Sequence, residues 1–207
     1  MSELQPLAVK PKQGGYTLVE LAIAIAILAV LIVAGLSGVQ SILTSGKVND
    51  QIKTVAKLSS KVSSFYSGGT SGVTAAEVAR NGGWDTGKYT TSGSGATATA
   101  TITSSFGTTE TIASNGSTVI GDIAANTGFI YTIKAVPKSA CADLANGLSG
   151  LVYAIGVTAK DAGPLSSWAS TNTNVVKVSS ATGVNTANLA ASCDAGSTLD
   201  FQIGLKP

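Results

Sequence analysis

The sequence predicts an α+β fold in which a long N-terminal α-helix packs on a C-terminal antiparallel β-sheet head. Three observations lead to this prediction. An uncharged apolar run occupies residues 21–39, and a helix-like apolar spacing continues it. Residues 67–207 are rich in Thr, Ser, Gly, Val and Ala, a composition typical of a small sheet domain with many turns. The length of 207 residues suits one domain with an extension.

Composition excludes several classes of function. The chain has no histidine, which removes Ser-His-Asp triads, imidazole metal sites and histidine general bases. Charged residues are only 12% and the formal net charge is +2, so no basic field favours nucleic-acid binding. A Walker A loop is also absent from the sequence. We therefore expect no catalysis, no cofactor and no specific nucleic-acid binding.

The N-terminal segment combines a polar lead with a membrane-length apolar run. Residues 1–15 contain Lys10 and Lys12, and the 19 residues of 21–39 carry no charge. As a helix this run measures about 28 Å, close to the hydrocarbon thickness of a bilayer. By the positive-inside rule, we expect the basic lead to stay in the cytoplasm and the chain after Val39 to cross the membrane. A secretory signal peptide fits less well, because its apolar core is usually about 7 to 15 residues. A simple membrane anchor stays open.

A short motif joins the lead to the apolar run. The string Gly-Tyr-Thr-Leu-Val-Glu at residues 15–20 resembles the signature of type IV pilins and type II secretion pseudopilins. The resemblance covers residue 10 to about residue 39. It implies that a prepilin peptidase cleaves between Gly15 and Tyr16 and methylates the new N-terminus of Tyr16. Removing 15 of the 207 residues leaves a mature chain of 192. Tyr16 departs from the Phe or Met more usual in the family, and Ser37 lies near the place of a helix proline found in many pilins.

Glu20 is the only charged residue between Lys12 and Lys47. A carboxylate within hydrocarbon costs about 2.5 to 3.5 kcal/mol, so its presence requires a reason. The resemblance implies an assembly role, in which Glu20 meets the positive N-terminal amine of a neighbouring subunit. The alternative is a residue at the membrane edge that stabilises the helix N-terminus through the macrodipole.

The apolar spacing predicts that the helix covers residues 16–66. Beyond Val39 the apolar residues recur at intervals of three and four, which indicates an amphipathic second half ending at residues 67–69. Lys53, Lys57 and Lys61 form a stripe on this half. We interpret the stripe as a solvated face, with contact to an acidic patch of a neighbouring subunit as the alternative.

The head, residues 67–207, is expected to contain short helices and strands. Short helices are predicted at residues 73–80 and 138–147. Residues 81–94 are predicted to form an irregular loop. The sequon at residues 115–117 is interpreted as a turn between strands. Strand-like patterns occur at residues 96–103, 118–123, 129–136, 151–158, 175–178 and 199–205.

Cys141 and Cys193 are the only cysteines, and the orientation inferred above exports both. A disulfide is the expected state, and reduced thiols or metal ligands are the alternatives. Asp194 and Asp200 lie near Cys193, but two carboxylates are far from the six to eight oxygens that calcium requires. We therefore expect no metal. The wide disulfide-bounded region, residues 141–193, resembles type IVb pilins more than type IVa pilins.

Together these features predict a structural subunit of a type IV pilus, resembling the IVb group. Its expected partners are identical subunits, the prepilin peptidase and N-methyltransferase, the inner-membrane assembly machinery, and membrane lipid before assembly. The expected locations are the inner membrane, with the head in the periplasm, and then the extracellular pilus. The alternatives are a minor pilin, a type II secretion pseudopilin or a membrane-anchored adhesin.

Overall fold

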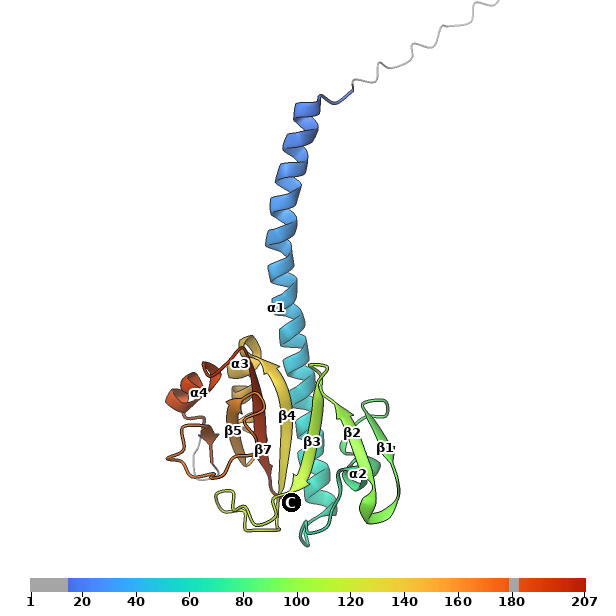
Figure 1. Ribbon diagram of the computed structural model, residues 1–207, viewed down its shortest axis with the longest axis vertical. Helices are drawn as coiled ribbons and strands as arrows, with labels where there is room; N and C mark the ends of the chain where they lie inside the picture. Colours follow the sequence, from blue (N-terminus) through green and yellow to red (C-terminus); the bar gives the residue numbers. More distant parts are fainter. Residues whose placement is uncertain (1–14, 179–182) are drawn as a thin grey trace, which may run out of the picture. The chain divides into compact units, whose positions relative to one another are not determined.

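The computed structural model describes residues 15–178 and 183–207. Two compact units divide the chain, Met1–Ile42 and Leu43–Pro207, and one helix, α1, runs through the boundary. Figure 1 shows the elements in order. The helices are α1 (Leu18–Phe65), α2 (Ala75–Val78), α3 (Lys138–Leu148) and α4 (Thr186–Cys193), with a π-helical turn at Ala79–Gly83 and a 3-10 turn at Gly95–Thr97. The strands are β1 (Tyr89–Ser92), β2 (Thr99–Thr103), β3 (Thr109–Ser114), β4 (Phe129–Pro137), β5 (Ala154–Ala159), β6 (Val175–Lys177) and β7 (Thr198–Leu205).

The second half of α1 is amphipathic, as the apolar spacing predicted. Val48, Val55, Leu58 and Val62 are buried, and they recur at intervals that place them on one face of the helix. No proline interrupts α1. The helix ends at Phe65, and a turn containing Gly69 follows, where a φ of 121° suits only glycine.

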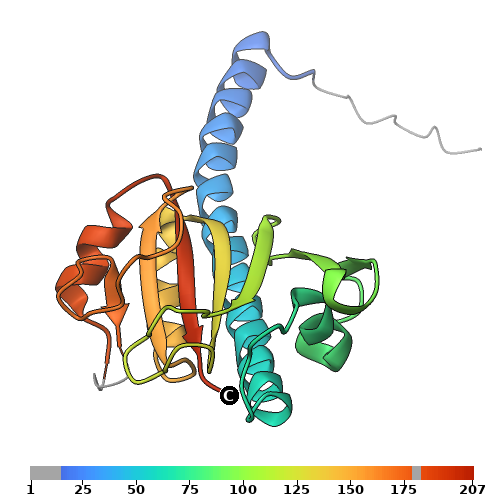
Figure 2. The same cartoon turned by 60° about the horizontal axis from the view of Figure 1, so that its bottom comes forward.

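The seven strands of the described residues form one antiparallel sheet in the order β1-β2-β3-β4-β7-β5-β6. The C-terminal strand β7 is inserted between β4 and β5, so the sheet centre joins residues that are far apart in the sequence. Figure 2 shows the Leu43–Phe65 part of α1 lying against one face of this sheet. The main core forms there, between α1, α3 and the inward side chains of the central strands, which include Phe129, Tyr131, Ile155 and Phe201.

A second, smaller core covers part of the opposite face. Its buried members are Ile120, Ile123, Leu165 and Trp168, which belong to two loops, together with Ala154, Val175 and Val178 from β5 and the region of β6. Gly156 on β5 leaves the space for this cluster, because a Cβ there would collide with Leu165. The two faces of β5 are therefore buried against different cores.

Several predicted elements are confirmed and others are wrong. The expected strands at residues 129–136, 151–158, 175–178 and 199–205 correspond to β4, β5, β6 and β7. Residues 118–123 do not form a strand. Ile120 and Ile123 instead pair with each other across a tight turn in which Gly121 has a φ of 58°. Both isoleucines are buried in the second core, and that burial explains the apolar pattern.

Three elements were not expected: β1 within the predicted loop at residues 81–94, β3 and α4. Strand β3 was missed because one of its inward positions is Glu110, which interrupts the apolar alternation. The expected strand at residues 96–103 begins only at Thr99, because a 3-10 turn precedes it. Helix α3 runs through Gly147 to Leu148, one residue beyond the expected end.

Candidate processing and assembly site

The first turn of α1 is capped by Thr17. Its hydroxyl oxygen Oγ1 accepts a hydrogen bond from the backbone N–H of Glu20 at 3.2 Å, and its carbonyl accepts from the N–H of Leu21 at 3.1 Å. This is the Thr-x-x-Glu arrangement of a helix N-cap. Thr17 was missed as a structural residue, although the spacing of Thr17 and Glu20 would have revealed it. The cap makes Leu18 the first helical residue.

Gly15 and Tyr16 consequently lie outside the helix. Tyr16 exposes 84% of its surface, and among the described residues beyond its chain neighbours, none lies within 4 Å of the position of a Cβ on Gly15. Both residues are exposed in the described part of the chain, so the peptide bond between them is accessible. The predicted leader otherwise falls outside the described residues.

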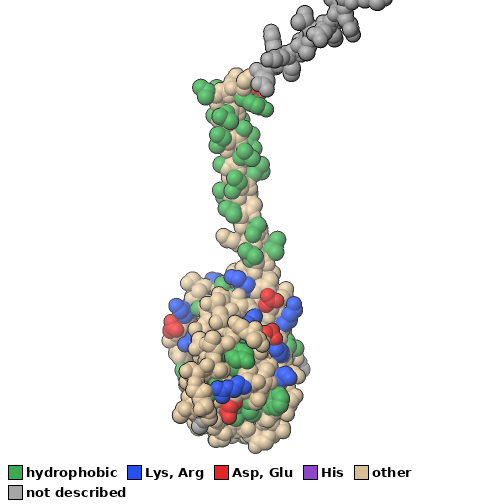
Figure 3. All heavy atoms as spheres, turned by 90° about the vertical axis from the view of Figure 1, so that its right-hand side faces the viewer, with side chains coloured by type: hydrophobic (Ala, Val, Ile, Leu, Met, Phe, Trp, Pro, Cys, Tyr) green, Lys and Arg blue, Asp and Glu red, His purple; other side chains and the backbone are tan. Residues whose placement is uncertain are grey.

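The first half of α1 presents apolar side chains all around its circumference. Figure 3 shows hydrophobic side chains along this stretch. The helix is long and apolar enough to cross a membrane, judged by length and composition. Such a surface is unstable in water, at about 25 cal/mol per Å² of apolar area, so lipid or protein must cover it. The large apolar side chains that expose at least 53% of their surface are Leu18, Val19, Leu21, Ile23, Ile25, Ile27, Leu28, Val30, Leu31, Ile32, Val33, Leu36, Val39, Ile42 and Leu43.

Glu20 lies at the N-terminal edge of this apolar surface, with its side chain exposed. Its place in the first turn puts the carboxylate where the helix dipole favours a negative charge. Within the described residues before Lys47, it is the only charged side chain. The same carboxylate is therefore accessible to a cation supplied by another chain.

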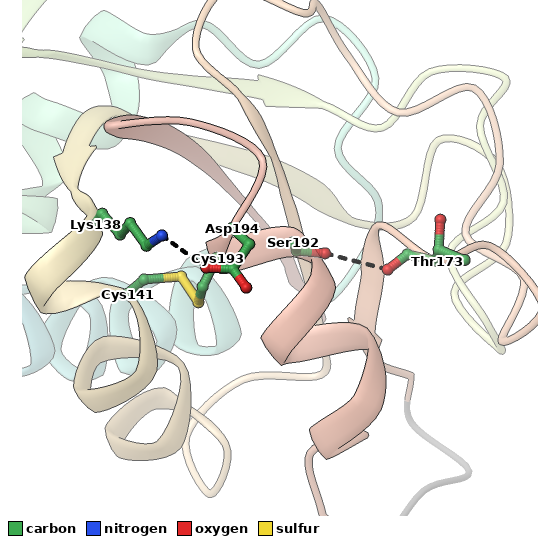
Figure 4. Close-up of a disulfide and its surroundings, with 6 residues drawn as sticks. All are labelled: Lys138, Cys141, Thr173, Ser192, Cys193 and Asp194. Carbon is green, nitrogen blue, oxygen red and sulfur yellow. Dashed lines mark hydrogen bonds and ion pairs between the residues drawn. A yellow bond between two sulfur atoms is a disulfide. The ribbon is translucent and has the colours of Figure 1, made fainter.

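The disulfide between Cys141 and Cys193 joins the start of α3 to the end of α4, with 5.8 Å between the Cα atoms (Figure 4). An ion pair between Lys138 Nζ and Asp194 Oδ1, 2.6 Å long, lies beside it. The Ser192 hydroxyl donates to the carbonyl of Thr173 at 3.1 Å, which ties α4 to the loop before β6. The expected disulfide is thus present, and α4 is the helix that carries its second cysteine.

The two carboxylates considered for calcium have other partners. Asp194 pairs with Lys138, and Asp200 accepts hydrogen bonds from the backbone N–H groups of Ala135 and Asp161. Across residues 15–178 and 183–207, no three His, Cys, Asp or Glu side chains are grouped as metal ligands would be.

Comparisons with known proteins agree with this geometry. The family model of the prokaryotic N-terminal methylation motif matches residues 10–36. The crystal structure of the type IV b pilin from Salmonella typhi resembles this chain with a TM-score of 0.51 at 21% identity, covering 77% of this chain and 99% of that one. The chain carries the type IV pilin methylation motif on a pilin-like fold. TcpA, a type IV pilin from Vibrio cholerae El Tor biotype, gives a TM-score of 0.50 at 14% identity, covering 75% of this chain and 98% of TcpA. No curated protein sequence matches the chain.

The pilin-like fold confirms the predicted fold class, a long N-terminal helix packed on an antiparallel sheet with a disulfide between Cys141 and Cys193. The three lysines of the predicted stripe on α1 each have a contact in the structure. Lys57 forms an ion pair with Asp85 at 2.5 Å, and this contact lowers the pKa of the Asp85 carboxyl. Lys53 lies 3.9 Å from Asp50, and Lys61 lies over the ring of Phe65. Lys57 is therefore engaged within the head of this pilin-like chain.

A buried polar cluster, which the sequence did not reveal, fastens α1 to the sheet of the pilin-like head. Glu110 on β3 is 1% exposed and accepts hydrogen bonds from Gln51 Nε2 at 2.5 Å and Trp84 Nε1 at 3.2 Å. Gln51 also donates to the Tyr131 hydroxyl at 3.1 Å and accepts from the N–H of Ser105 at 3.0 Å. Burial raises the pKa of the Glu110 carboxyl, although these hydrogen bonds act in the opposite direction. The cluster fixes which turn of α1 faces β3.

Proposed function

We propose that this chain is a structural subunit of a type IV pilus, of the IVb kind. A prepilin peptidase removes residues 1–15 by cutting between Gly15 and Tyr16, and the new N-terminus of Tyr16 is methylated. Residues 21–39 hold the subunit in the inner membrane, with the head, residues 67–207, in the periplasm. Identical subunits then leave the membrane and polymerise into an extracellular filament. They do so through the first, apolar half of the helix that spans residues 16–66.

One observation carries the proposal: the methylation motif at residues 10–36 coincides with the part of α1 whose apolar surface is exposed all round. Lipid covers such a surface before assembly, and the same stretch of neighbouring subunits covers it afterwards. Because both lipid and neighbouring helices are apolar, the same segment can be stable in the membrane and in the filament. The fold that this chain shares with two type IV pilins supports the role of a structural subunit.

Glu20 can form a directional ion pair between subunits, which apolar contacts alone do not provide. Cleavage at Gly15 creates a charged amine on Tyr16, four residues from a carboxylate that is otherwise alone among apolar side chains. Two opposite charges about 4 Å apart gain up to about 4 kcal/mol at an effective dielectric of 20, before desolvation. Such a contact between neighbouring subunits sets their axial stagger and exists only after processing.

The processing step is tested by the intact mass of the subunit recovered from sheared surface filaments. We expect a chain that begins at Tyr16 and carries one added methyl group. Gly15→Leu should yield an uncleaved membrane precursor and no filaments. Tyr16→Phe, which places the residue more usual in pilins at the cut, is the matched control and should be processed normally. A filament subunit that still begins at Met1 contradicts the proposal.

The same preparation separates the alternatives. A major pilin is the main protein of the filament, whereas a minor pilin or pseudopilin is a trace component or is absent from surface filaments. A membrane-anchored adhesin stays with the membrane fraction and retains α1 as a tether. Quantifying the subunit in the sheared and membrane fractions therefore distinguishes these roles.

A further inference from the structure

A groove of about 480 Å³ lies on the face of the sheet opposite α1. Tyr131 and Ile133 point from β4 into the main core beneath α1, so the alternating Thr132 and Lys134 point to the other face and into this groove. Thr111 on β3 lies directly beside Thr132, and Gln202 on β7 lies on its other side. Three adjacent strands thus form the floor of a volume within the range of small-molecule sites, about 300 to 1,000 Å³. We call it the Thr132 groove.

One wall of the Thr132 groove is held by two buried side chains of β7. Asp200, 4% exposed, accepts from the N–H of Asp161 at 2.9 Å. Gln202, 2% exposed, accepts from the N–H of Leu165 and donates to the carbonyl of Gly163, both at 2.8 Å. These bonds fix the loop of residues 161–165, which includes the lining residue Pro164.

The other wall is held by Asn115, which is 2% exposed. Its Nδ2 donates to the carbonyls of Thr118 and Ala124 at 2.6 and 2.8 Å, and its Oδ1 accepts from the N–H of Gly128 at 3.0 Å. Both walls are therefore set by buried hydrogen bonds before any ligand arrives, which lowers the ordering cost of binding.

The polar groups that face the groove are largely unused. The hydroxyls of Thr111, Thr118 and Thr132 and the ammonium of Lys134 make no hydrogen bond or ion pair to any residue that the structure describes. The exposed carboxylate of Asp161 forms one long ion pair among the described residues, with Lys160 at 3.8 Å. Thr132 and Lys134 are half-buried, so their polar ends lie within the hollow. The floor thus offers several donors and acceptors together.

The chemistry of this lining selects among ligand classes. The charged groups are Lys134, Asp161 and Asp200, an excess of one negative charge, which disfavours phosphate, sulfate and nucleic acid. Strands β3, β4 and β7 are each paired on both sides, so no peptide can add to the sheet here. The apolar lining is shallow and consists of Ala113, Ile130 and Pro164, too little to anchor a large side chain.

An uncharged saccharide matches every part of this lining. Its hydroxyls both donate and accept, as the threonines, Lys134 and Asp161 require, and its C–H faces can rest on Ile130 and Pro164. We propose that the Thr132 groove is a binding site for a neutral saccharide. The site lies wholly within the head, so the proposal stands whether or not the chain polymerises.

The test uses the full-length chain in micelles of an amine-oxide detergent, because alkyl-glycoside detergents present a sugar themselves. Saturation-transfer NMR is run with the neutral disaccharides lactose, maltose and chitobiose, and with sialyllactose and heparin disaccharide as charged probes. We expect at least one neutral disaccharide to bind. Affinity should fall about tenfold or more, equivalent to about 1.4 kcal/mol, in Thr132→Val and in Lys134→Met.

Thr101→Val is the matched control, because Thr101 is an exposed threonine on β2 that does not line the groove. Val keeps the strand propensity at both positions, so folding should not differ between the two threonine variants. Binding by Thr101→Val should equal that of the wild type. The proposal is overturned if no neutral disaccharide binds, if only the charged probes bind, or if Thr132→Val and Lys134→Met bind as well as the control.

Discussion

The carboxylate of Asp200 accepts a hydrogen bond from the backbone N–H of Ala135 at 2.9 Å, where the register of β4 shifts against β7. Its second oxygen accepts from the N–H of Asp161 at the same distance. Ala135 and Asp161 both have left-handed backbones, with φ of 53° and 59°. Such a conformation costs about 1 to 2 kcal/mol for a residue with a Cβ. One buried carboxylate therefore stabilises two strained positions on either side of β7.

Replacing Asp200 by Asn should destabilise the head by about 1 to 3 kcal/mol. An amide has one acceptor oxygen, so its NH2 group would face the second backbone N–H and leave that donor unsatisfied. Urea unfolding of the full-length chain in micelles, followed by tryptophan fluorescence, measures the change. Asp194→Asn is the control, because it removes only an exposed ion pair worth under about 1 kcal/mol. Equal effects of the two substitutions would contradict the role given to Asp200.

The buried Glu110 predicts a pH dependence of stability. Burial raises its pKa above the ordinary value of 4.5, so the folded state holds this proton more tightly than the unfolded state. The stability contributed by the proton is fully present below the unfolded pKa and is lost as the pH rises through the folded pKa. The free energy of unfolding should therefore contain a component that decreases with rising pH in this window.

Glu110→Gln isolates this component, because it keeps the shape and removes the titration. The groups facing Glu110 are Gln51, Trp84 and Tyr131, with Lys88 acting at longer range. Burial also raises the pKa of the Tyr131 hydroxyl, well above 10.0, so tyrosine does not titrate in the same window. The free energies of unfolding of Glu110→Gln and the wild type are measured from pH 4 to pH 8. As the pH rises, the wild type should lose stability relative to the variant. A pH-independent difference would exclude Glu110 as the titrating group.

Loss of the disulfide should destabilise the head by about 4 kcal/mol in the chain-entropy model, since the cysteines are 52 residues apart. The double variant Cys141→Ala, Cys193→Ala is preferred to serine, because Cys141 is fully buried and has no need of a hydroxyl. Its thermal unfolding should match that of the reduced wild-type chain. If reduction leaves the unfolding temperature unchanged, the bridge does not contribute as inferred.

Glu20→Val should leave membrane insertion and cleavage at Gly15 intact and strongly reduce the number of filaments. The reason is the loss of the carboxylate that the Tyr16 amine of a neighbouring subunit would meet. Thr17→Ala provides the comparison, because it removes the N-cap at a cost of about 1 kcal/mol but keeps the charge. Subunit recovered by shearing is quantified for both variants. A normal filament yield from Glu20→Val would leave Glu20 only its helix-dipole role and remove it from assembly.

Features that depend on adjacent residues could be predicted from the sequence. Three such features are linear patterns that can be read along the chain: the motif at residues 15–20, the apolar run at residues 21–39 and the amphipathic second half of α1. The last two follow from the spacing of apolar residues along a helix. The disulfide was equally accessible, because two cysteines allow only one pairing within the chain. Even the Thr17 cap was present in the sequence as Thr-x-x-Glu.

Tertiary structure alone decided how the head is organised. Strand β3 lacks the apolar alternation of a half-buried strand, because Glu110 occupies one of its inward positions. A carboxylate is tolerated there because Gln51 and Trp84, from distant segments, donate hydrogen bonds to it. Insertion of β7 between β4 and β5 brings Asp200 and Gln202 to the loop of residues 161–165 and so builds the Thr132 groove. Pairings between residues dozens of positions apart leave no periodic trace in the sequence. The sequence by itself therefore determined the membrane-length helix, its N-terminal methylation motif and the single disulfide, and the long-range packing of the sheet decided the strand order and the groove on its outer face.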